Sequence, residues 1–266
     1  MEHEIIAGMD LFYAPEEIEA ARIIAAACVR SVPLIQQCWG LTTPEDCRVY
    51  VMTSWKQFLF DSAPWLWKAY LTLTFPLVAK KASSIWSYAG GWSLAYGRRI
   101  VVGIKPPRLI QEGDRSLGEQ IFLPDRDLRE TFQTVTCHEL VHAFTIHLRL
   151  PTWLHEGVAT LAMEHYLNRR IVRDDSLERL TGWGYLNHRR GTEPLRVDRQ
   201  QALIAQYARG YWLTRYLDET QPQLLRDLLS RRMRHKALEA KVASAFGKEP
   251  GSFWQEIDGD LCSRYG

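Results

Sequence analysis

Hydrophobic positions recur at two different periods in the first 125 residues of the chain. Helical spacing behind an acidic first turn predicts a helix over 15–39, which Pro33 kinks or shortens and Gly40 ends. Gly90-Gly91 is typical of a turn. Short alternating or β-branched runs predict three strands, at 47–52, 99–104 and 119–123. We therefore expect the sheet of the protein to lie in this part of the chain.

Beyond residue 126 the hydrophobic spacing is mostly helical. It predicts helices near 128–148, 153–170, 199–218, 222–234 and 236–246. Strands and helices first, followed by helices alone, indicate an α+β architecture. The 266 residues suffice for two lobes, each with a buried core. We predict a sheet-bearing N-terminal lobe, residues 1–150, and a mainly helical C-terminal lobe, residues 151–266.

An aromatic-rich insert, roughly residues 55–81, interrupts this pattern. Its segment 66–79 is apolar apart from one lysine and two threonines. It is shorter than the roughly 20 apolar residues that a membrane-spanning helix needs, and it contains Pro76. We favour a buried helix. A membrane-surface element is the alternative that the tryptophans leave open.

The composition is that of an ordinary globular protein, with 46% hydrophobic and 24% charged residues. The 33 basic and 31 acidic side chains nearly cancel, so bulk charge indicates no nucleic-acid partner. Five cysteines without CxxC spacing indicate neither a disulfide framework nor a cysteine-based zinc site. The acidic N-terminus is not followed by an apolar segment, so we expect no secretion signal and a cytoplasmic location. No pattern indicates an oligomeric state.

The predicted helix near 128–148 contains His138-Glu139-Leu140-Val141-His142. Side chains four residues apart lie on one face of a helix, so both imidazoles can reach one metal ion. Glu139 lies about 100° around the helix from His138, which leaves its carboxylate free to act on a metal-bound water. The alternative is a pair of surface histidines on an amphipathic helix.

A catalytic zinc site needs a third protein ligand and one open position. Glu156 is the candidate for the third ligand, because residues 148–151 can turn the chain and pack a second helix back on the first. Near the start of that helix, Glu156 would face the metal. Its alternative role is that of an acidic residue that merely suits the helix dipole.

The run HELVH followed by WLHEGVA resembles the gluzincin branch of the zinc metallopeptidases, the thermolysin-like group, over residues 126–165. The resemblance implies a zincin-like catalytic domain with His138, His142 and Glu156 as Zn²⁺ ligands and Glu139 as general base. A weaker resemblance continues through residues 206–217, where these families carry a tyrosine-led helix. Tyr207 is then either an oxyanion donor or a packing residue.

The sequence departs from this family four residues after the third ligand. The family usually has an acid there, as in EGxAE, which orients a zinc-bound imidazole; this chain has Thr160. Loss of such a partner weakens metal binding or activity, although Thr160 itself, or Glu164 one turn further on, can accept the same hydrogen bond. We expect His155 to point away from the metal, because it neighbours Glu156 on the helix.

Together these features predict a zinc metallopeptidase that hydrolyses a peptide or protein substrate. We expect the substrate to lie between the lobes and to pair with an edge strand before the zinc helix, for which residues 119–123 are the candidate. The alternative is a binding or regulatory module that keeps the zincin fold and metal with weak or no catalysis. The aromatic insert could associate that module with a membrane surface.

Overall fold

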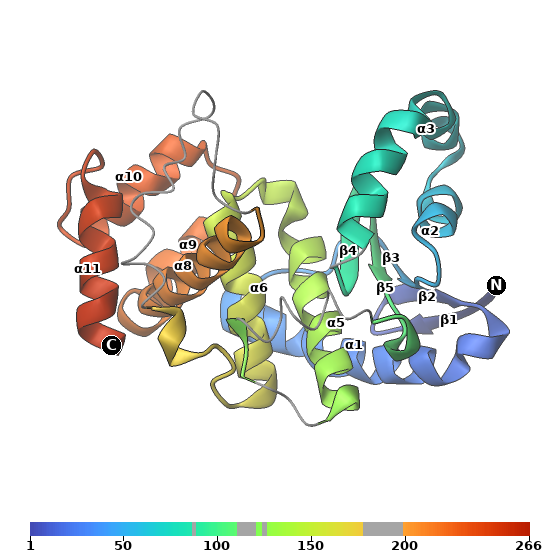
Figure 1. Cartoon of the computed structure of the whole chain (residues 1–266), viewed down its shortest axis with the longest axis horizontal. Helices are drawn as coiled ribbons and strands as arrows, with labels where there is room; N and C mark the ends of the chain where they lie inside the picture. The colour runs from blue at the N-terminus through green and yellow to red at the C-terminus, as the bar shows by residue number, and fades with distance from the viewer. Residues whose placement is uncertain (87–88, 111–120, 124–126, 178–198) are drawn as a thin grey trace.

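The computed structural model describes residues 1–86, 89–110, 121–123, 127–177 and 199–266, without the side chains of 199–206. A sheet with its covering helices forms one part of the molecule, and a group of helices forms the other (Figure 1). This arrangement agrees with the α+β prediction.

The sheet has five strands in the order β1-β2-β3-β5-β4. β1 with β2 and β4 with β5 pair antiparallel, whereas β3 is parallel to both of its neighbours. β4 therefore lies at one edge of the sheet and runs opposite to β5. The strands are β1 (Glu2–Ile6), β2 (Met9–Tyr13), β3 (Asp46–Val51), β4 (Gly91–Tyr96) and β5 (Arg99–Ile104).

Side chains of alternate residues in β5 enter two different hydrophobic clusters. Ile100, Val102 and Ile104 join the large cluster formed with α1 (Ile18–Trp39) and α5 (Leu128–Thr145). Val101 joins a smaller cluster on the opposite face, formed with two helices, α2 (Trp55–Ser62) and α3 (Trp65–Trp86). Because side chains alternate across a strand, α1 with α5 and α2 with α3 cover opposite faces of the sheet.

The large cluster continues through the helical part of the molecule, so one core connects both parts. The helices there are α6 (Thr152–Leu167), α8 (Arg199–Thr220), α9 (Pro222–Ser230), α10 (His235–Ala245) and α11 (Phe253–Tyr265). Short 3-10 turns are η1 (Pro15–Glu17), η2 (Pro107–Leu109), η3 (Ile146–Leu148) and η4 (Asp174–Ser176).

Gly157 on α6 and Gly210 on α8 allow the backbones of the two helices to touch where they cross. A Cβ atom on Gly157 would lie 2.3 Å from the carbonyl oxygen of Gly210, and a Cβ on Gly210 would lie 2.4 Å from that of Trp153. Neither position has room for a side chain. The crossing fixes the start of α6, which carries Glu156.

Most of the predicted elements are confirmed. The helix over 15–39 appears as η1 and α1, which runs through Pro33 to Gly40 in the left-handed conformation (φ 70°). The strands at 47–52 and 99–104 appear as β3 and β5 within a residue. The helices expected beyond residue 126 are present, although the one predicted over 222–234 ends at Ser230. The lobe boundary at residue 150 stays a prediction.

One expectation about the sheet is wrong. Gly91 begins β4 instead of lying in a turn, because Gly91–Tyr96 pairs along its whole length with β5. Of the strand expected over 119–123, positions 119 and 120 lie outside the described residues. Residues 121–123 are described and are not part of the five-stranded sheet; Phe122 makes an isolated bridge to Val172. The hairpin of β1 and β2 was not predicted.

Within the described residues, no helix is both long enough and apolar enough to cross a membrane.

Candidate metal centre

The α5 helix begins where the sequence predicts. The side chain of Asp127 accepts a hydrogen bond from the backbone nitrogen of Arg129 at 2.8 Å, which satisfies one of the unpaired donors at the helix start. From there α5 runs without interruption across His138 and His142. The four-residue spacing brings their Nε2 atoms to 3.0 Å from each other.

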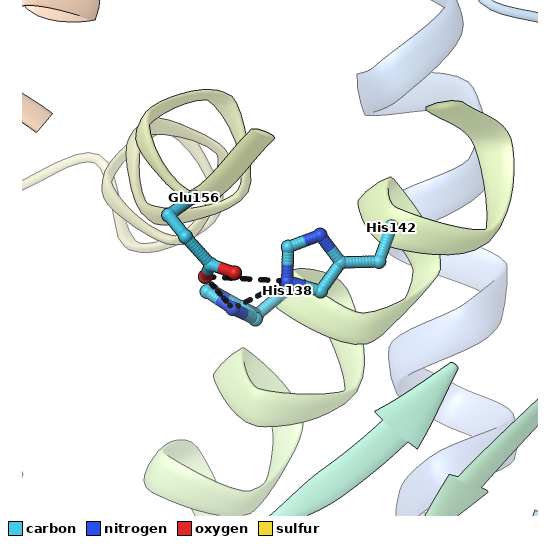
Figure 2. A group of neighbouring side chains, drawn as sticks. All are labelled: His138, His142 and Glu156. Carbon is cyan, nitrogen blue, oxygen red and sulfur yellow. Dashed lines mark hydrogen bonds and ion pairs between the residues drawn. The ribbon is translucent and has the colours of Figure 1, made fainter. Parts of the chain in front are cut away.

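The chain turns back after α5 as the sequence predicts. The 3-10 turn at residues 146–148 ends at Arg149 in the left-handed conformation (φ 52°), and α6 then packs against α5. Glu156 on α6 points toward the two imidazoles of α5 (Figure 2). Its Oε2 atom lies 3.5 Å from Nε2 of His138 and 3.4 Å from Nε2 of His142.

These three side chains are spaced for one metal ion. One ligand atom from each of His138, His142 and Glu156 lies within 4.8 Å of the others. Ligands about 2.0–2.2 Å from a tetrahedral zinc lie roughly 3.3–3.6 Å apart, close to the observed separations of 3.0, 3.4 and 3.5 Å. Among the described residues, the buried Oε2 of Glu156 has no hydrogen-bond partner. Two imidazoles and a carboxylate with these spacings fit Zn²⁺.

The site holds its carboxylate in the charged form. Burial alone would raise the pKa of Glu156, but the charge of His142 and the contact with His138 outweigh burial and hold this pKa well below its ordinary value. Burial lowers the pKa of His142, and the charge of Glu156 more than reverses that shift. An anionic carboxylate is the form that binds a cation.

Glu139 lies beside the edge of the sheet and is buried. The hydroxyl of Ser93, on β4, lies 3.0 Å from both Oε2 and the backbone oxygen of Glu139 and can donate to either. A Cβ atom on Gly91 would lie 2.5 Å from Cγ of Glu139. Two residues of β4 therefore confine this side chain, and sequence reasoning missed them because it placed no strand there.

Thr160 stands where the resembled families usually carry an acid. Thr160 is 1% exposed, and its hydroxyl has no hydrogen-bond partner among the described residues. The same holds for the buried Nδ1 of His138. Glu164, the other candidate to orient an imidazole, instead accepts hydrogen bonds from Tyr211 and from Arg215 at 2.8 Å. Among the described residues, neither Thr160 nor Glu164 is therefore hydrogen-bonded to a candidate metal ligand.

His155 is not one of the three candidate ligands, but it makes a contact with one of them that the sequence did not predict. Its Nε2 lies 3.1 Å from Nδ1 of His142, with the ring centroids 4.0 Å apart. Because α6 crosses close to α5, two neighbouring positions of α6 can both reach α5. Burial and then the nearby His142 lower the pKa of His155 to about 3. The Nε2 of a neutral His155 can accept a hydrogen bond from Nδ1–H of His142.

Tyr207 lies on α8, half-buried against the main core. It stands one helical turn before Gly210, which contacts the first turn of α6. Tyr207 therefore lies on nearly the same face of α8 as Gly210, one turn from the contact with α6. Its role as an oxyanion donor stays a prediction.

Neither protein-family models nor curated proteins match the sequence, and no solved structure matches the fold.

Proposed function

We propose that the protein is a zinc-dependent metallopeptidase of the gluzincin type, with a zincin-like catalytic domain. The observation that carries the proposal is the convergence of His138, His142 and Glu156 at the spacing of a tetrahedral zinc site. The sequence resemblance in HELVH and WLHEGVA supplies the class of reaction. No other group of three metal-ligating side chains meets this spacing among the described residues.

Bound zinc would lower the pKa of a coordinated water and polarise the scissile carbonyl. Glu139 is the general base and is not needed as a ligand. Ser93 donates to its Oε2, which leaves Oε1 to accept the water proton and return it to the leaving amine. Tyr207 is the candidate donor to the oxyanion.

The substrate pairs with β4 in this proposal, and residues 119–123 are no longer the candidate. β4 is the last strand of the sheet order, and Ser93 links it directly to Glu139. An extended peptide that adds to an exposed strand gains main-chain hydrogen bonds. Such pairing would carry a scissile bond past Glu139 toward the metal.

A catalytically weak or inactive binding module remains the second candidate. Thr160, at the position where the resembled families usually carry an acid, favours it, because loss of an acid that orients a ligating imidazole weakens metal binding or activity. Metal content alone does not separate this candidate from the peptidase, since both bind zinc.

Metal analysis of the full chain, purified without chelator, tests the site. We expect about one zinc per chain, and His142→Ala should lose it, since two remaining ligands hold zinc poorly. His147→Ala is the matched control, because His147 lies five residues further on and is exposed. Tight zinc in the His142→Ala protein would contradict the ligand assignment.

A further inference from the structure

The buried helix expected over 66–79 is wrong in its burial: the segment lies on α3, but only Leu71 is buried in it, and a stripe of large apolar side chains faces solvent. Leu66, Tyr70, Leu73 and Leu77 follow one another at intervals of four, three and four residues, which places them on one face of a helix. They are 61%, 55%, 84% and 80% exposed. Trp65, at the start of α3, is 76% exposed. Contiguous exposed apolar surface of this kind marks an interaction site.

The opposite face of α3 holds the helix on the sheet. Leu71 and Ala82 are buried in the smaller cluster. Phe75 packs against Trp55 of α2, with ring centroids 6.1 Å apart, and Trp67 against Tyr96 of β4, at 5.5 Å. The helix therefore packs on the protein through one face, and the leucine stripe on the other face is exposed to solvent. Figure 1 shows α3 at the periphery of the molecule.

The charge on α3 itself has one sign. The helix carries three lysines and no aspartate or glutamate, and Lys80 and Lys81 are exposed. These two lysines follow Leu77 by three and four residues, which places them one turn beyond the end of the stripe. The chain as a whole is almost neutral, with 33 basic and 31 acidic residues, so this segment is a local concentration of cations.

We infer that α3 is a docking element for an anionic lipid surface, lying in the plane of the headgroups with its leucine stripe inserted. Tryptophan and leucine on one face with lysines beside them are typical of helices that lie in a membrane interface. Each lysine near an anionic surface adds attraction. A second copy of α3 is a poorer partner for this face, because the helix has no acidic residue that could pair with Lys80 and Lys81 of the other copy in either orientation.

Vesicle flotation with the full chain tests this inference. We expect the protein to float with vesicles of phosphatidylcholine and phosphatidylglycerol in equal parts, and at least about tenfold less with phosphatidylcholine alone. Leu73→Asp combined with Leu77→Asp should lower partitioning by at least about tenfold, because it removes inserted apolar surface. Lys80→Glu with Lys81→Glu should have an effect of similar size.

Matched controls lie elsewhere on the surface. Val29→Asp and Leu128→Asp change side chains that are 59% and 60% exposed outside the stripe, and Lys236→Glu changes an exposed lysine on α10. All three should float like the unmodified chain. The zinc-site variant His142→Ala should also float normally, which separates this inference from the proposed function.

Three results would overturn the inference. One is failure to float with anionic vesicles. Another is equal flotation with phosphatidylcholine alone. The third is a concentration-dependent dimer in solution that Leu73→Asp with Leu77→Asp abolishes, which would assign the stripe to a second copy of the chain.

Discussion

The imidazole of His155 lies against that of His142, with Nε2 of the former 3.1 Å from Nδ1 of the latter. If Nε2 of His142 binds a metal, its Nδ1 carries a hydrogen, and Nε2 of His155 can accept a hydrogen bond from that N–H group. Ligating histidines usually donate this proton to a carboxylate, a carbonyl or water, and the partner fixes the orientation of the ring. His155 is thus a positioning residue for a proposed zinc ligand.

His155→Ala should therefore weaken zinc binding by roughly 10–100-fold, the usual effect of losing such a partner. His155→Gln, whose side-chain oxygen can accept the same hydrogen bond, should recover part of the affinity. Competition with a chromogenic chelator measures both variants. Unchanged affinity in His155→Ala would mean that the ring of His142 is held by packing alone.

Thr160→Glu should leave zinc bound and preserve or raise any peptidase activity, because it introduces the acid that is usual at this position in the families that the motif resembles. Such an acid usually orients a ligating imidazole, and among the described residues the buried Nδ1 of His138 has no hydrogen-bond partner. Thr160→Val is the matched control. It removes a hydroxyl that has no described hydrogen-bond partner, so it should not lower the melting temperature. A Thr160→Glu protein that folds without zinc would show that this position faces another group.

Gly157→Ala should destabilise the protein by at least about 1–3 kcal/mol, the usual cost of overpacking a core. Its added Cβ would lie 2.3 Å from the carbonyl oxygen of Gly210, and backbone cannot move aside cheaply. Gly259→Ala in α11 is the control, since a Cβ there meets nothing within 4 Å and alanine favours a helix. Thermal unfolding should show a lower midpoint for the first variant only. Equal midpoints would mean that α6 and α8 separate readily.

The sequence was sufficient to predict α5 and α6 and to bring the three candidate ligands together. Their helical spacing is regular, and the intervening loop is too short for many arrangements. It did not predict β4, because Gly91 and the mixed polarity of the strand resemble a turn. Its partner β5 lies across a tight connection at Gly97 (φ 68°), and pairing with β5 overrides the weak strand propensity.

The contact of His155 with His142 was missed for a different physical reason. The angle between neighbouring residues on one helix suggests that only one of His155 and Glu156 can face a given point. That argument ignores how closely α5 approaches α6. The position of α6 depends on its crossing with α8 at two glycines and on its packing against α5. This position determines which side chains of α6 reach α5.

Glu139→Gln separates chemistry from structure most directly. Glutamine keeps the size of the side chain and can still accept the hydrogen bond of Ser93, but it is no longer a base. Zinc content and melting temperature should therefore change little. Hydrolysis should fall by at least the roughly 10²–10⁴-fold that a general base contributes.

The decisive measurement is turnover of a mixed peptide library, followed by mass spectrometry, on the unmodified chain and on Glu139→Gln at equal zinc content. The account predicts cleavage by the unmodified chain and at least about a hundredfold less by the variant. Equal turnover by both proteins would contradict the role of Glu139. Absence of turnover by both zinc-loaded proteins would contradict the peptidase and favour the binding module.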